Sequence, residues 1–164
     1  MVSTTKMSSN GASAISTLKR DLIRLICSGH STKEAAKIMR IPLKIAEAHR
    51  KSAMAKLGLN NAVKLAHWAI ANNLLEPETA SNGANALSAR EREFVRLICG
   101  GCSTREAAKV MNISATTAET HRENVMEKLR LHRVVKLTHW AIANGLVEIM
   151  KFGEAPNNQK SAAF

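Results

Sequence analysis

The chain has 164 residues and a formal net charge of +11, with 24 Lys and Arg residues against 13 Asp and Glu residues. Its hydrophobic content of 45% is that of a globular protein, and its length suits one ordinary domain or two very small ones. The longest uncharged stretches are too weakly apolar to span a bilayer, which excludes a membrane protein, and the basic excess makes nucleic acid the first partner to consider.

The two ends of the chain have the composition of disordered tails. Residues 1–13 and 149–164 are biased toward Ser, Asn and Gly. The N-terminal stretch contains no apolar run of the length that a secretory signal needs, so we expect a cytoplasmic protein. Three cysteines cannot all pair with one another within the chain, and a reducing compartment would keep them as thiols.

The sequence between the tails is a tandem duplication of one unit. An offset of 72 residues aligns residues 14–76 with residues 86–148 without gaps, and 35 of the 63 aligned pairs are identical. We therefore predict two domains with these boundaries. Residues 77–85 lie between them and are rich in Pro, Gly, Ser and Asn, which predicts a flexible linker.

The first copy lacks two of the signals that start helices in the second. Its first helix begins Ser-Thr-Leu-Lys at Ser16, where the second copy has the Ser-x-x-Glu spacing of a capping box. Its third helix has Pro42 and Ile45 at the positions of Ser114 and Thr117, so a cap hydroxyl is missing. Loss of a cap typically costs about 1 kcal/mol, which predicts a looser first domain.

The second copy predicts four helices. Capping boxes at 88–91 and 103–106 open the first two, which run to the Gly100-Gly101 pair and to Met111. Ser114 caps a third helix that runs to about Leu129, and a fourth spans about 134–144 before Gly145. No stretch alternates with a period of two, so we predict an all-α fold without strands.

The second and third helices of each copy have the spacing of a helix-turn-helix motif, whose second helix lies in the major groove of DNA. In the second copy, Ala118, Arg122, Val125, Met126 and Leu129 share one side of the third helix and are expected to pack. The other side carries Thr116, Glu119, Thr120, Glu123 and Glu127. The alternative is a merely solvated helix face, and the tight turn and the basic charge favour DNA.

At these residues the chain resembles a known family: each copy resembles a LuxR-type (GerE-like) DNA-binding domain. Thr117, Ala118, His121, Asn124, Lys128 and Leu129 occupy positions of the family's recognition motif, with Ala118 in place of the usual Val. The resemblance implies two small four-helix helix-turn-helix domains joined by a flexible linker. It also implies DNA contact through the third helix and dimerisation through the fourth.

Together the spacing and the resemblance select the candidate contact residues. In the second copy the candidate DNA contacts are Thr104, Thr116, Thr117, Glu119, Thr120, Arg122, Glu123 and Lys128, of which Thr104, Thr117 and Lys128 are backbone or packing positions. In the first copy they are Lys44, Glu47, Ala48, Arg50, Lys51 and Lys56. The candidate dimerisation residues are Val63, His67, Trp68, Val135, His139 and Trp140.

Charge differs between the copies. The first carries 11 basic and 4 acidic residues, net +7, and the second carries 10 and 7, net +3. We hypothesise that the first copy supplies mainly phosphate attraction and the second supplies base selection.

Catalytic and metal-binding arrangements are not supported. Cys99 and Cys102 have C-x-x-C spacing, but the first copy has His30 where the second has Cys102, and no second C-x-x-C exists. The histidines accompany no triad-like arrangement, and no Gly-rich phosphate loop follows a strand. We expect no enzyme activity, no metal and no cofactor.

The sequence predicts a nucleoid-associated transcriptional regulator that binds double-stranded DNA sequence-specifically, mainly through its second copy. One alternative is a non-specific architectural DNA binder, and another is a module that pairs through the fourth helix with a LuxR-type regulator and inhibits it. The copies could pair within one chain as a pseudo-dimer or between chains as a homodimer. No receiver or ligand-binding domain fits in the remaining residues, so we expect control by expression level, oligomerisation or a partner protein.

Overall fold

The computed structural model describes residues 15–76 and 86–152. The predicted tail 1–13, the predicted linker 77–85 and residues 153–164 of the predicted C-terminal tail lie outside the described residues. Within the described ranges all regular secondary structure is helical, which confirms the all-α prediction. None of the described helices is long and apolar enough to cross a membrane.

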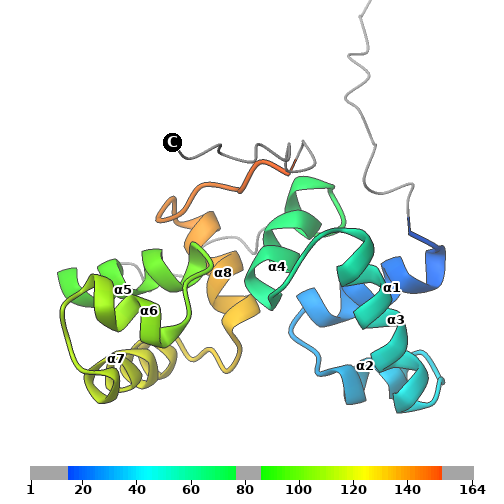
Figure 1. The fold of residues 1–164 in the computed structure, drawn as a ribbon, viewed down its shortest axis with the longest axis horizontal. Helices are drawn as coiled ribbons and strands as arrows, with labels where there is room; N and C mark the ends of the chain where they lie inside the picture. Colours follow the sequence, from blue (N-terminus) through cyan, green and yellow to red (C-terminus); the bar gives the residue numbers. More distant parts are fainter. Residues whose placement is uncertain (1–14, 77–85, 153–164) are drawn as a thin grey trace, which may run out of the picture.

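Within residues 15–76 and 86–152, eight helices form two groups of four (Figure 1). The first four-helix group consists of α1 (Thr17–Cys27), α2 (Thr32–Ile38), α3 (Leu43–Lys56) and α4 (Ala62–Ala71). The second four-helix group consists of α5 (Ala89–Cys99), α6 (Thr104–Val110), α7 (Ala115–Lys128) and α8 (Val134–Ala143). The helices of the second group lie within one or two residues of their predicted bounds.

The predicted capping boxes explain where the helices begin. In α5 the hydroxyl of Ser88 accepts from the Glu91 amide, while the Glu91 carboxylate accepts from the Ser88 amide. The same reciprocal pair starts α6. Ser16 makes no side-chain cap at α1, and α3 follows Pro42 without one, as the sequence predicts. The first group therefore has weaker starts at its first and third helices than the second group has.

Each group encloses its own apolar core. In the first, α1 packs against α2, α3 and α4 around Leu22, Ile23 and Leu65. In the second, α5 packs against α6, α7 and α8 around Phe94, Val95 and Leu137. Trp68 and Trp140 belong to the cores of their own groups.

The two groups dock through their fourth helices. Helix α4 packs against α8 at the centre of the molecule (Figure 1). Val135 of α8 is 5% exposed and lies in the core of the first group, so the two cores meet at this point. The fourth helices of the two copies thus pack against each other within the chain.

Polar contacts also cross this interface. His67 of α4 is fully buried, and its Nε2 lies 2.8 Å from the Cys99 carbonyl oxygen at the end of α5. Its Nδ1 accepts from the Met150 amide at 3.2 Å, in the segment that runs back from α8 toward α4. A carbonyl only accepts and an amide N–H only donates, so these two bonds require the neutral ring with its proton on Nε2.

Acidification is expected to weaken this docking through His67. Burial lowers the pKa of His67 below its ordinary value of 6.5, although the bond to the Cys99 carbonyl partly opposes the shift. The folded chain then binds fewer protons here than the unfolded chain, so this contribution to stability is complete above pH 6.5 and is lost as the pH falls through the folded-state pKa. Denaturant unfolding of the parent and of His67→Gln between pH 7.5 and pH 5 measures this pH-dependent contribution of His67 to the free energy of unfolding. The parent is expected to lose more stability on acidification, and parallel losses in the two proteins would contradict the assignment.

Candidate nucleic-acid interface

Each group contains two short helices joined by a tight turn. Helix α6 ends at Val110 and α7 begins at Ala115, with Asn112 in the turn at φ 55°. Asn tolerates this left-handed conformation better than most residues. The turn between α2 and α3 has the same shape, with Arg40 at φ 54°. Both turns produce the helix-turn-helix geometry that the spacing predicts.

Helix α7 buries one narrow side and exposes the rest. Ala118 and Val125 are fully buried, and the His121 ring lies 6.3 Å from the Phe94 ring, centroid to centroid. The predicted outward residues are exposed, namely Thr116, Glu119, Thr120, Glu123 and Glu127. The exposed face is therefore free to contact a groove in DNA.

One residue of the predicted packing side lies elsewhere. The Arg122 side chain is 45% exposed and lies 3.8 Å from the Glu119 carboxylate, so the prediction that it packs is wrong. An unpaired guanidinium is too costly to bury, and the long Arg side chain extends to solvent instead. Exposed pairs of this kind contribute little, so both side chains can exchange partners when a ligand binds.

The start of α7 is held by hydroxyl groups. Ser114 Oγ accepts from the Thr117 amide at 3.0 Å and lies 2.8 Å from Thr117 Oγ1. Thr117 therefore already contributes to the helix cap, which positions the first turn of α7. In α3 the corresponding residues are Pro42 and Ile45, and Ile45 is 44% exposed.

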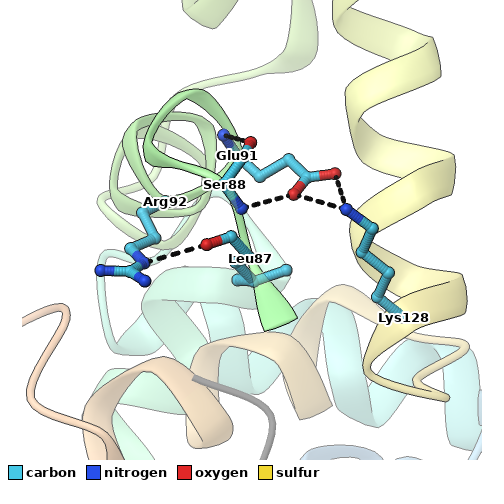
Figure 2. A network of polar contacts seen from close by, with 5 residues as sticks. All are labelled: Leu87, Ser88, Glu91, Arg92 and Lys128. Carbon is cyan, nitrogen blue, oxygen red and sulfur yellow. Dashed lines mark hydrogen bonds and ion pairs between the residues drawn. The ribbon is translucent and has the colours of Figure 1, made fainter. Parts of the chain in front are cut away.

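Lys128 is engaged in a network that fastens α7 to α5 (Figure 2). Its Nζ lies 2.8 and 2.9 Å from the two carboxylate oxygens of Glu91, and the Glu91 side chain is only 5% exposed. Burial disfavours the charged carboxylate, but Lys128 and the Ser88 bonds outweigh it and hold the pKa of Glu91 below its ordinary value. In this structure Lys128 therefore serves packing, one of the two roles expected for it.

The first group lacks this network. Its equivalent positions are Lys19 and Lys56, two cations, and Lys19 donates to Ser52 Oγ at 2.9 Å. Helix α3 exposes Lys44, Glu47, Ala48, Lys51 and Lys56 to solvent. Arg50 is half-buried and donates to Thr32 Oγ1 at 3.2 Å. Thr104, the repeat partner of Thr32, is half-buried at the start of α6.

The candidate dimerisation residues are all buried. Val63, His67, Trp68, Val135, His139 and Trp140 are each at most 6% exposed. They lie on α4 and α8, the two helices that pack against each other, and Val135 and His67 make the cross-group contacts described above.

The cysteines have inert surroundings. Burial raises the pKa values of the Cys27 and Cys99 thiols to about 12, so neither is a thiolate at neutral pH. Cys102 is half-buried and unbonded to sulfur. The described residues contain no group of three or more His, Cys, Asp or Glu side chains that could hold a metal ion.

Sequence reasoning missed a set of residues in the connections between helices. His132 and Arg133, in the turn between α7 and α8, face His30 and Ser31 of the first group across a groove. Arg133 Nη2 lies 3.4 Å from the Glu34 carboxylate. The repeat alignment could have identified these residues, because it pairs His132 and Arg133 of the second copy with the uncharged Asn60 and Asn61 of the first.

Comparisons with known proteins agree with this geometry. The family model "Bacterial regulatory proteins, luxR family" matches residues 15–69 and 85–141. The transcriptional regulatory protein MctR of Rhizobium johnstonii is 37% identical over 70 residues, covering 43% of this chain and 33% of MctR. The response regulator UvrY of Escherichia coli is 35% identical over 72 residues, covering 44% of this chain and 33% of UvrY.

The chain thus matches only about a third of the length of these two relatives. An uncharacterized response regulatory protein of Escherichia coli, YgeK, is 38% identical over 65 residues, which cover 40% of this chain and 44% of that protein. No solved structure matches the chain significantly.

Proposed function

The chain belongs to the luxR family of bacterial regulatory proteins, and from this premise we propose that it regulates transcription by binding double-stranded DNA sequence-specifically. The units that bind are two LuxR-type copies with the boundaries 14–76 and 86–148. The location that follows from this role is the nucleoid. The observation that carries the proposal is the exposed face of α7, the second helix of a helix-turn-helix motif.

The charge of that face favours specific over non-specific binding. A helix that only attracts phosphate would present mainly Lys and Arg, whereas beside Arg122 α7 exposes three glutamates, Glu119, Glu123 and Glu127. A carboxylate is repelled by the backbone but accepts a hydrogen bond from cytosine N4, and a Thr side chain contacts a thymine methyl. The second copy is thus the principal base reader in this proposal, and the architectural alternative is disfavoured.

Helix α3 suits the complementary role. Its exposed side carries Lys44, Lys51 and Lys56, and at the position of Glu119 and Thr120 it has Glu47 and Ala48. These lysines attract the phosphate backbone of DNA, and α3 has fewer side chains that can distinguish bases than α7 has. The first copy then adds affinity and the second adds selection.

The docking of α4 on α8 bears on the remaining alternative. An inhibitor that captures a LuxR-type regulator through its fourth helix would need that face accessible. Here Val63 and Val135 are both buried. We propose instead that the fourth helices pair the two copies within one chain, so that a single chain presents two recognition helices.

Selection from a random pool of duplexes at near-physiological salt tests the function. The full chain is expected to enrich a motif, and Thr120→Ala or Glu123→Ala is expected to change the preferred bases, since each good base contact contributes about 1 to 3 kcal/mol of discrimination. The matched control is Glu93→Ala, since Glu93 is a half-exposed glutamate on α5 that pairs with Arg90. Uniform loss of affinity with an unchanged motif would show that Thr120 and Glu123 are not readers, and no enrichment would favour the architectural binder.

A further inference from the structure

A groove of about 360 Å³ runs between the two four-helix groups. His30 and Arg50 of the first group line one side, and Arg122, His132 and Arg133 of the second line the other. Three of these side chains carry a full positive charge. We name this the junction groove.

The junction groove lies between the two helix-turn-helix units. Arg50 belongs to α3 and Arg122 to α7, so both recognition helices contribute to its walls. The connection that carries His132 and Arg133 passes between α7 and α2 (Figure 1). Arg122 also borders a hollow with Glu119 and Glu123 of α7, and Arg50 borders one with Glu47 and Lys51 of α3, so the groove adjoins the exposed faces of both recognition helices.

The charge in the groove is not a by-product of the duplicated fold. The repeat-related groove on the other side of the interface has Cys102 in place of His30, Asn60 in place of His132 and Asn61 in place of Arg133. At all three positions the junction groove has a His or Arg side chain, and the other groove has a Cys or Asn side chain. The two grooves occupy repeat-related positions, and the junction groove contains three arginine side chains, whereas the other contains Lys64 and Arg122.

Two arginines of the junction groove can exchange their present ion-pair partners for a ligand. Arg133 pairs with Glu34 at 3.4 Å, and both side chains are about half exposed, at 44% and 54%. Arg122 pairs with Glu119 in a similarly exposed contact. Exposed pairs are weak, whereas guanidinium–phosphate bonds are charge-assisted and often bidentate. Arg50 is different, because its bond to Thr32 holds its guanidinium at the groove edge.

We propose that the junction groove binds the phosphate backbone of the DNA that lies between the segments contacted by α3 and α7, with Arg133 as its central contact. This inference rests on the proposed DNA-binding function and adds to it a site that joins the two copies on one duplex. The groove contributes affinity without base selection, because phosphates carry no sequence.

The test uses the residue that the repeat itself supplies. Arg133 precedes α8 as its N-cap and makes no side-chain cap bond, whereas Asn61 at the equivalent position caps α4. Arg133→Asn therefore removes the charge and adds a favourable cap, so the variant is expected to fold at least as stably as the parent. Arg24→Asn is the matched control, since Arg24 lies with Asn72 and Asn73 at the other end of α4.

Affinity for the duplex enriched by the parent is measured against salt concentration. Arg133→Asn is expected to bind several-fold more weakly, with the slope of log K against log salt reduced by about 1 and the preferred sequence unchanged. In Glu34→Gln the glutamine side chain still completes the capping box of α2. The carboxylate that competes with DNA phosphate for Arg133 is removed, so this variant is expected to bind the duplex more tightly than the parent.

The outcomes separate this inference from the function on which it rests. Specific binding by the parent with an unchanged slope in Arg133→Asn would overturn the groove and leave the function standing. An equal loss in Arg24→Asn would also overturn it, because the effect would then be one of net charge. Failure of the parent to bind any duplex would overturn both.

Discussion

Replacing Val135 with Asp is expected to separate the two four-helix groups and to lower the stability of the docked chain by more than about 3 kcal/mol. Val135 projects from α8 into the core of the first group and is 5% exposed. A carboxylate there would lose its hydration against the apolar side chains of the first core, and this cost opposes docking although Val135 also borders the groove that contains Arg50 and Arg133. Undocking α8 relieves this cost, so the expected product is a chain whose groups remain helical but no longer touch.

Small-angle scattering and denaturant unfolding measure this result together. The radius of gyration is expected to rise while the far-ultraviolet circular dichroism stays nearly constant. Val110→Asp is the control, because the same substitution falls on a valine that is 63% exposed on α6, where surface changes rarely exceed about 0.5 kcal/mol. A compact Val135→Asp variant of parental stability would contradict the docking of α8 on the first core.

Glu91→Ala is expected to destabilise the second four-helix group by about 2 kcal/mol, because it removes both the capping box of α5 and the ion pair with Lys128. Glu91→Gln separates the two contributions. An amide at this position still accepts from the Ser88 amide, so only the charge is lost and the expected effect is about half as large.

The pH dependence provides a second readout for Glu91. Its pKa is lowered in the folded chain, so the unfolded chain binds the proton more readily. The stability that this carboxylate supplies is complete above its unfolded pKa, near 4.5, and is lost as the pH falls through the lower folded value. Thermal unfolding between pH 6 and pH 2.5 is expected to show a shallower acid loss in Glu91→Gln than in the parent. Identical pH profiles would show that the Lys128 pair contributes nothing.

Local sequence signals predict the helices because their causes are local. The Ser-x-x-Glu boxes at 88–91 and 103–106 satisfy amides within a single turn, so four residues suffice to place a helix start. The same reasoning identifies the missing box at Ser16 in the first copy. The repeat then transfers every element from one copy to the other.

The partners that meet across helices could not be predicted in this way. Glu91 and Lys128 are 37 residues apart, and their pairing depends on how α7 packs on α5. The choice between pairing within and between chains depends on tertiary contacts, since α4 and α8 have nearly the same sequence and would form similar apolar faces in either case. The sequence does not single out Arg133, because the proposed role of Arg133 depends on the residues opposite it on α2 and α3. No spacing along the chain predicts that these residues lie close together.

The interface between α4 and α8 has a consequence for how the protein responds to its own abundance. Two separate subunits that dimerise through such helices come apart on dilution, and their occupancy of a site rises steeply with concentration. Two halves of one chain are held at a fixed effective concentration, so their association does not change with the amount of protein present. Under the proposed function, and with the pairing within one chain, a controlled gene is expected to respond to the number of molecules in a graded, hyperbolic way, without the threshold that obligate dimerisation creates.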